Sequence, residues 1–256
     1  MGSLRALMDC IGADTSGEFS VLRRFFGFIR NRVPTDPDTT VTAQVSMLQK
    51  MRDIQHQHIH VNVIRVGFDA IAAGSQDQAL EKLDYAIYRM PNIYRQVNLG
   101  VGRVLHFFID SADAEGGDDI GSEDEADELS DDWSVDNNGI DVFVVRNISD
   151  DDFVGISPVG GSCDKPSKDD GLCGGEIGRT FERVARTFSH ETGHFLGLEH
   201  NHDDDECPDT AAGLLNLMAQ TGCVDDGTEA SIRNAVQLTG GQGNTMRDHC
   251  SVRGGC

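Results

Sequence analysis

The stretch SHETGHFLGLEH, residues 189–200, carries the main chemistry of this chain and determines where its longest predicted helical pattern ends. His190 and His194 are four residues apart, so a helix places both imidazoles on one face, where they can hold one metal ion. Gly197 can adopt a left-handed backbone conformation that ends the helix and turns the chain back. This turn would bring His200 to the same ion. The stretch therefore predicts a helix, a sharp turn and a three-histidine metal site.

Three protein ligands leave one coordination position for water, which distinguishes catalytic zinc sites from structural ones. Zinc lowers the pKa of such a water towards about 7 and polarises a substrate carbonyl. Glu191 can take the proton of the water and pass it to a leaving amine. We therefore expect His190, His194 and His200 to bind catalytic zinc, with Glu191 as general base and acid. The alternative is a set of surface histidines on an ordinary helix.

Residues 190–200, HETGHFLGLEH, resemble the HExxHxxGxxH signature of the metzincin zinc endopeptidases. Further along, NLM at 216–218 is similar to the metzincin Met-turn, which implies that Met218 lies beneath the zinc site as an apolar floor. The resemblance implies an α/β fold with a twisted mixed sheet, an active-site helix and a small C-terminal subdomain. It also implies that substrate binds in extended form along an antiparallel edge strand, for which IDVFVVRNI (140–148) is the candidate.

The sequence indicates the metzincin subfamily less clearly than it indicates the resemblance to metzincins. Asn201, which follows the third histidine, is not a diagnostic residue of the astacin, adamalysin, serralysin or matrixin groups. Gln220 stands two residues past Met218, so the tyrosine ligand of astacins and serralysins is missing. The segment 207–210 (CPDT), Cys223 and LTGGQGNTMR (238–247) are similar to the tail of pappalysin-like enzymes.

Composition narrows the possible partners. The chain has 256 residues, with 43 acidic and 21 basic side chains, and a net charge of −22. This charge argues against binding to nucleic acid or to anionic lipid. No apolar run approaches the roughly 20 residues needed to span a bilayer. The expected partner is therefore a protein or peptide substrate, with a specificity pocket walled by the Met-turn and residues 219–230.

Acidic side chains are concentrated between two predicted strands. Residues 110–136 contain 13 acidic residues and no basic one, which predicts a solvated surface loop. A calcium site is the alternative, because carboxylate oxygens suit that ion. The same two interpretations apply to residues 203–206 (DDDE), where a loop is favoured.

The order of elements predicts an α/β sheet with a helix as the crossover between strands. Ser75 is the expected N-cap of the first helix, which Pro91 should end or kink. The predicted strands are 61–66, 103–110, 140–148 and a shorter one near 153–159, and the predicted helices are 75–95 and Glu176 to about Gly197, with a looser helical pattern over 42–56.

The expected domain organisation follows from this order. Residues 1–40 form an N-terminal extension that could act as a pro-segment, and residues 41–256 form the catalytic domain. Within that domain, the metzincin resemblance implies that 41–199 form an upper subdomain and 200–256 a lower one with the Met-turn. Two alternative functions remain open: a non-catalytic zinc-binding interaction module, and a latent zymogen whose residues 1–40 occupy the cleft.

Seven cysteines indicate disulfides, and hence secretion or an oxidising compartment, although no signal peptide is visible. Six cysteines allow 15 pairings, and neighbours in sequence give three pairs. These pairs are Cys163 with Cys173, Cys207 with Cys223, and Cys250 with Cys256. Cys10 is left over, and its thiolate could block the zinc in a latent form.

The other histidines have weaker predicted roles. His56, His58 and His60 alternate along a strand, so they form either an exposed polar edge or, less favourably, a second metal site. We expect His106 and His249 to be structural. Beside the third zinc ligand, residues 201 and 202 either contact substrate or stabilise their loop.

Overall fold

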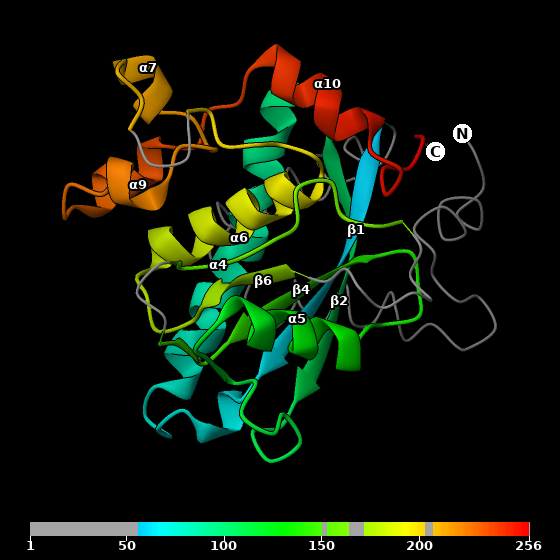
Figure 1. Cartoon of the computed structure of the whole chain (residues 1–256), viewed down its shortest axis with the longest axis vertical. Helices are drawn as coiled ribbons and strands as arrows, with labels where there is room; N and C mark the ends of the chain where they lie inside the picture. Colours follow the sequence, from blue (N-terminus) through cyan, green and yellow to red (C-terminus); the bar gives the residue numbers. More distant parts are fainter. Residues whose placement is uncertain (1–55, 150–152, 164–171, 203–206, 256) are drawn as a thin grey trace, which may run out of the picture.

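A parallel four-stranded sheet lies at the centre of the computed structural model, which describes residues 56–149, 153–163, 172–202 and 207–255 (Figure 1). The strand order is β2-β1-β4-β6, and every adjacent pair is parallel. The strands are β1 (His58–Val66), β2 (Gly100–Ile109), β4 (Ile140–Val145) and β6 (Leu172–Glu176). β1 and β4 are the two inner strands and are buried on both faces, including the polar residues His58, His60 and Asn62 of β1.

Helix α4 (Gln76–Tyr94) crosses from β1 to β2 and confirms the predicted helix with its N-cap at Ser75. The 3₁₀ turns η1 (Phe68–Ala70) and η2 (Arg95–Val97) flank it. Of the two predicted effects of Pro91, an end or a kink, the first does not occur, because the helix continues to Tyr94. The residues around it, Met90, Ile93 and Tyr94, are buried in the core, and this packing offsets the backbone hydrogen bond that proline removes.

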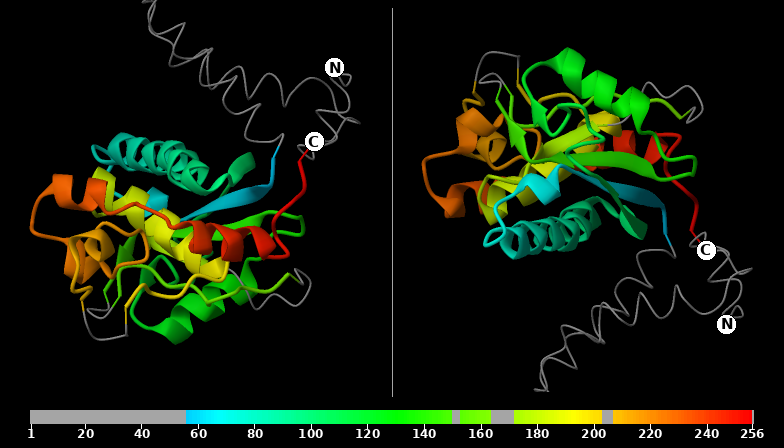
Figure 2. Two further views of the ribbon diagram at one scale, coloured as in Figure 1. Left: turned by 90° about the horizontal axis from the view of Figure 1, so that it is seen from above. Right: turned by 90° about the horizontal axis from the view of Figure 1, so that it is seen from below.

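The two faces of the sheet are covered by different helices (Figure 2). Val142 and Val144 of β4 pack in one core cluster with residues of α4 and of the later helix α6 (Phe181–Phe195). Phe143 and Val145 point the other way and pack with α5 (Glu123–Asp132). The alternation along β4 thus places α4 and α6 on one face and α5 on the other.

The prediction of a loop over 110–136 is wrong in part, because 123–132 form α5. The Ser122 hydroxyl caps this helix by accepting a hydrogen bond from the Glu125 amide, and acidic residues in the first turn favour its N-terminus. Ala126 and Leu129, three residues apart, supply a buried face. Two short strands beside α5, β3 (Asp119–Ile120) and β5 (Asn147–Ile148), form a second parallel sheet.

The candidate substrate edge at 140–148 is also corrected. This segment splits at Arg146 into β4 and β5, and β4 lies between β1 and β6 with no free edge. The short strand predicted near 153–159 is reduced to one antiparallel bridge, in which Ile156 and Cys173 exchange backbone hydrogen bonds of 3.0 and 2.9 Å. The segment that pairs antiparallel with the edge strand β6 is therefore the one around Ile156, residues 153–163, which we call the edge segment.

Helix α6 begins later than the predicted Glu176, because residues 172–176 form β6 and Thr180 is the N-cap. Sequence periodicity placed the start too early because Ile177 lies four residues before Phe181, as on one face of a helix. Four short helices follow α6 and gather on its side away from β6 (Figure 1). They are α7 (Ala211–Leu214), α8 (Thr221–Val224), α9 (Glu229–Asn234) and α10 (Gly240–Asp248).

The cysteines pair differently from the prediction at two places. Cys207 and Cys223 form the predicted disulfide, with a Cα–Cα separation of 5.3 Å. Cys163 is bonded to Cys250, which follows the end of α10, with a Cα–Cα separation of 6.0 Å. Cys173 is a buried free thiol on β6. Cys10, Cys256 and the predictions for residues 1–40, 42–55 and 203–206 lie outside the described residues.

Among the described residues, none of the helices has the length and apolar character of a membrane span.

Candidate metal centre

Three histidine side chains converge at the end of α6. His190 and His194 project from the helix, and Gly197, with a φ of 90°, turns the chain so that His200 faces them. The Nε2 atom of His194 lies 3.0 Å from that of His190 and 3.2 Å from that of His200. The helix, the left-handed glycine and the convergence of the three rings are all as the sequence predicts.

The opposite ring nitrogens fix the tautomers of two of these histidines. His190 donates its Nδ1–H to the Leu217 carbonyl at 2.7 Å, and His194 donates its Nδ1–H to the Leu198 carbonyl at 2.6 Å. A carbonyl can only accept, so the hydrogen of each neutral ring sits on Nδ1 and both Nε2 atoms present lone pairs. Burial lowers the pKa of His190 well below its usual value and that of His194 to about 4, so both rings are neutral near pH 7.

This donor set fits a metal ion. Two nitrogen lone pairs that face each other at 3.0 Å repel unless a cation lies between them. Around zinc, a histidine usually binds the metal through one ring nitrogen and donates a hydrogen bond from the other nitrogen to a group such as a backbone carbonyl. This second bond holds the tautomer and the ring orientation. His190, His194 and His200 are therefore the residues that could hold the ion.

Glu191 follows the first histidine and is 5 % exposed. Burial raises the pKa of its carboxyl to about 8, and the positive charge of Arg186 opposes this rise. The edge segment packs directly on it: a Cβ added at Gly155 would lie 2.8 Å from Glu191 Cγ and 2.6 Å from Thr187 Cγ2. Sequence reasoning did not identify Gly155, because only the folded edge segment shows that a side chain there would collide with Glu191.

Met218 lies against the same helix, where the Met-turn resemblance places it. Its side chain is fully buried, and a Cβ at Gly193, between the two helical histidines, would lie 2.9 Å from the Met218 sulfur. The Met218 carbonyl accepts a hydrogen bond from the Asn201 amide at 3.1 Å, and the Asn201 side chain donates to the Gly213 carbonyl at 2.9 Å. These bonds give Asn201 a role in stabilising the loop.

Arg186, also missed by sequence reasoning, joins α6 to the segment that contains Met218. It is 1 % exposed and donates to the carbonyls of Leu217 and Ala235, each at 2.9 Å. It also donates to the Thr221 hydroxyl at 2.9 Å and to the Ala219 carbonyl. Burial lowers the pKa of Arg186 to about 10, so the guanidinium remains charged at neutral pH. No local signal singled it out, because Glu182 and Arg183 are charged residues of the same helix.

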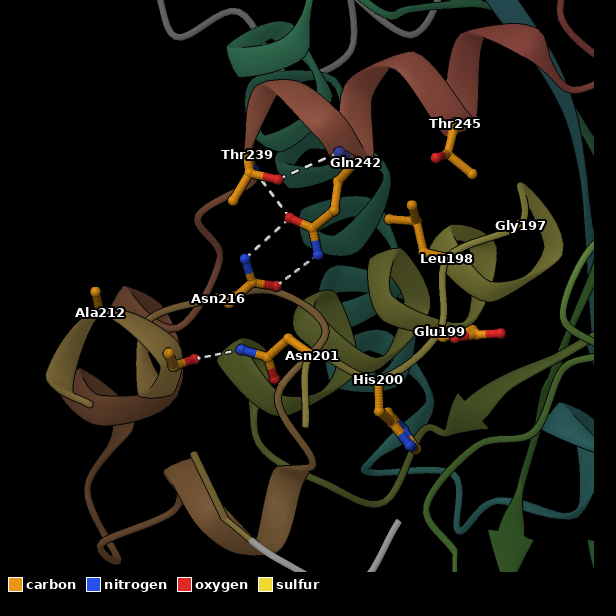
Figure 3. Close-up of a pocket in the computed structure, with 11 residues that line it drawn as sticks. Gly197, Leu198, Glu199, His200, Asn201, Ala212, Asn216, Thr239, Gln242 and Thr245 are labelled. Carbon is orange, nitrogen blue, oxygen red and sulfur yellow. Dashed lines mark hydrogen bonds between the residues drawn. The ribbon is translucent and has the colours of Figure 1, made fainter. Parts of the chain in front are cut away.

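A cavity of about 540 Å³ adjoins the third histidine (Figure 3). Its walls are the 197–201 loop, the start of α7, Asn216 and one face of α10. Asn216 and Gln242 close one side by pairing their amides through two hydrogen bonds of 2.9 Å. The sequence analysis expects the Met-turn and residues 219–230 to wall the specificity pocket. Asn216 of the Met-turn lines this cavity, but residues 219–230, all of which the structure describes, do not.

The alternating histidines of β1 are not an exposed edge, contrary to the prediction. His58 and His60 are 1 % and 2 % exposed, because β2 approaches closely at Gly102 and the chain end pairs with His58 through Arg253. Burial, and then the charge of Arg103, lowers the pKa of His60 to about 4. In the described part of the chain, no third metal-ligating side chain joins this pair.

His249 has the structural role that the sequence predicts. Its Nδ1 accepts the Ser251 amide hydrogen at 3.2 Å, and its Nε2–H donates to the Gly161 carbonyl at 2.9 Å. For the acidic segment 110–136, which the structure describes throughout, no three carboxylates converge in the way that a metal site requires.

Comparison with known proteins places this site in a family. No curated protein sequence matches the chain. Among solved structures, the chain is similar to archaemetzincin from Methanopyrus kandleri, with 13 % identity and a TM-score of 0.46 over 74 % of this chain and 95 % of that one. The family model described as metallo-peptidase family M12 matches residues 71–231, which run from the turn before α4 into α9 and include all three histidines, Glu191 and Met218. The chain belongs to metallo-peptidase family M12.

Proposed function

We propose that this protein is a zinc-dependent endopeptidase that hydrolyses peptide bonds in protein or peptide substrates. His190, His194 and His200 hold the zinc, and Glu191 is the general base and acid. The observation that carries this proposal is the convergence of three Nε2 atoms, two of them with their Nδ1 hydrogens committed to carbonyls, beside a buried carboxyl group. When bound, zinc supplies Lewis-acid polarisation of the scissile carbonyl and lowers the pKa of the attacking water.

The protein groups perform the positioning and the proton transfer. The Leu217 and Leu198 carbonyls hold the rings of His190 and His194 and make their Nε2 atoms better donors to a metal. In its ionised form, Glu191 accepts a proton from the attacking water and delivers it to the nitrogen of the leaving amine. Because water attacks the carbonyl directly, this route has no acyl-enzyme intermediate.

Substrate binding is proposed at the segment around Ile156. Ile156 is bridged to β6 on one side, and its neighbour Gly155 contacts Glu191, so an extended peptide paired with this segment would pass beside the catalytic carboxylate. We also propose that the protein works outside the cell or in another oxidising compartment. The two disulfides among the described residues support this location, because such bonds persist where thiols are oxidised.

Casein cleavage by the full chain, measured beside Glu191→Ala with bound zinc quantified in both, tests the proposal. We expect the wild type to cut casein and the variant to keep zinc without cutting. Fragment ends read by mass spectrometry would define the specificity. If neither protein cuts while both hold zinc, the non-catalytic module or the latent zymogen becomes the better account, and removal of residues 1–40 separates these two.

A further inference from the structure

Arg186 is a buried cation whose four acceptors are all uncharged. Its guanidinium reaches three backbone carbonyls and one hydroxyl between residues 217 and 235. A buried charge whose hydrogen-bond acceptors are all neutral is costly, even with Glu191 acting on it electrostatically, and an apolar side chain of similar size would avoid that cost. The planar fork of arginine, however, can bind several oxygens at once in fixed directions, which a neutral or single-centred group cannot do.

One of these acceptors also positions a candidate metal ligand. The Leu217 carbonyl accepts Nη2–H of Arg186 at 2.9 Å and Nδ1–H of His190 at 2.7 Å. The same Nη2 also donates to the Ala219 carbonyl, so Arg186 binds the chain on both sides of Met218. A shift of this turn would move the carbonyl that orients His190.

We propose that Arg186 is a positioning residue of the metal centre. It holds the 217–219 turn against α6 and, through the shared Leu217 carbonyl, fixes the orientation of His190. This inference rests on the zinc-binding function proposed above. Its competitor is a purely structural role, in which Arg186 only ties α6 to the helices that follow.

Arg183 provides a matched control for this structural role. It lies on the same helix and forms an ion pair with Asp225, so it also ties α6 to the later segment. Its partner lies outside the 217–219 turn, and its side chain is 29 % exposed. Arg183→Met therefore removes an ion pair between an arginine of α6 and the later segment, and it does not affect the Leu217 carbonyl.

The test measures zinc affinity of the full chain by competition with a chromophoric chelator, and the visible spectrum of the Co²⁺-loaded protein. For Arg186→Met we expect zinc binding about 10- to 100-fold weaker than in the wild type, with a changed Co²⁺ spectrum. For Arg183→Met we expect an affinity within about threefold of the wild type and the same spectrum, because its ion pair with Asp225 lies outside the 217–219 turn. Thermal unfolding of each variant reports its structural cost separately.

Arg186→Lys decides the matter if Arg186→Met does not fold. Lysine keeps the charge but cannot reach all four acceptors, so we expect a folded protein with about 10-fold weaker zinc binding and an altered Co²⁺ spectrum. Wild-type affinity and spectrum in a folded Arg186 variant would overturn the positioning role and leave the proposed function standing. A wild type that binds no zinc would overturn the proposed function and this inference with it.

Discussion

The Nε2 atoms of His190 and His194 lie 3.0 Å apart, although each ring has already committed its Nδ1 hydrogen to a backbone carbonyl. Without a cation, the two lone pairs repel in a buried site where neither ring readily takes up a proton. A metal ion converts this repulsion into two coordinate bonds. The folded protein should therefore bind a metal far better than the unfolded chain does.

Metal removal should lower stability for this reason. With free zinc at about 1,000 times the dissociation constant, binding adds about 4 kcal/mol to the free energy of unfolding. For a chain of this size, that corresponds to a Tm about 8 to 16 °C higher than in chelator. Differential scanning calorimetry with and without chelator measures the difference. His194→Ala is the control, and a shift as large as that of the wild type would place the metal elsewhere.

Gly155→Ala should impair turnover without unfolding the protein. The added methyl group would lie 2.8 Å from Glu191 Cγ, so either the carboxylate or the edge segment must move. A displacement near 1 Å can lower kcat by about 100-fold. Gly74→Ala is the matched control, because a Cβ there meets nothing within 4 Å. Equal kcat values for the two variants would show that the contact between Gly155 and Glu191 has no catalytic importance.

The two disulfides should contribute unequally to stability. Cys163 and Cys250 are 87 residues apart in sequence, whereas Cys207 and Cys223 are 16 apart. If the main effect is on the entropy of the unfolded chain, replacing the first pair by serine should lower the free energy of unfolding by about 1.5 kcal/mol more than replacing the second. Guanidinium unfolding of the two double variants measures this. The reverse order would mean that strain or residual structure dominates.

Cys173 should resist alkylation in the native protein. Burial raises the pKa of its thiol to about 12, so almost no thiolate forms at pH 8. Peptide mapping after iodoacetamide treatment should find Cys173 unmodified in buffer and modified in denaturant. Because the folded pKa exceeds the unfolded value near 9, the stabilising contribution is complete below pH 9 and is lost as the pH rises towards 12. Rapid native labelling at pH 8 would contradict this burial.

The sequence predicted the local parts of the site and missed the contacts between distant segments. The four-residue spacing of His190 and His194 and the left-handed turn at Gly197 follow from helix geometry, so they could be read directly. Gly155 and Arg186 act through partners 31 or more residues away in the chain, which no local pattern shows.

The same distinction applies to the fold. The crossover helix α4 and strands β1 and β2 were predicted because their periodicity is local. Strand β6 was not predicted, because its sequence LCGGE contains two glycines and no alternation of apolar and polar residues. The predicted pairing of Cys163 with Cys173 was wrong, because it was based on proximity in sequence, whereas Cys250 is the cysteine that lies beside Cys163 in space.

X-ray absorption at the zinc edge of the metal-loaded full chain tests the central claim most directly. The account predicts three imidazole nitrogens at about 2.0–2.1 Å and no sulfur ligand, with two imidazoles remaining in His200→Ala. Sulfur at about 2.3 Å, or an unchanged spectrum in His200→Ala, would contradict it, because the metal would then be held by residues other than this triad.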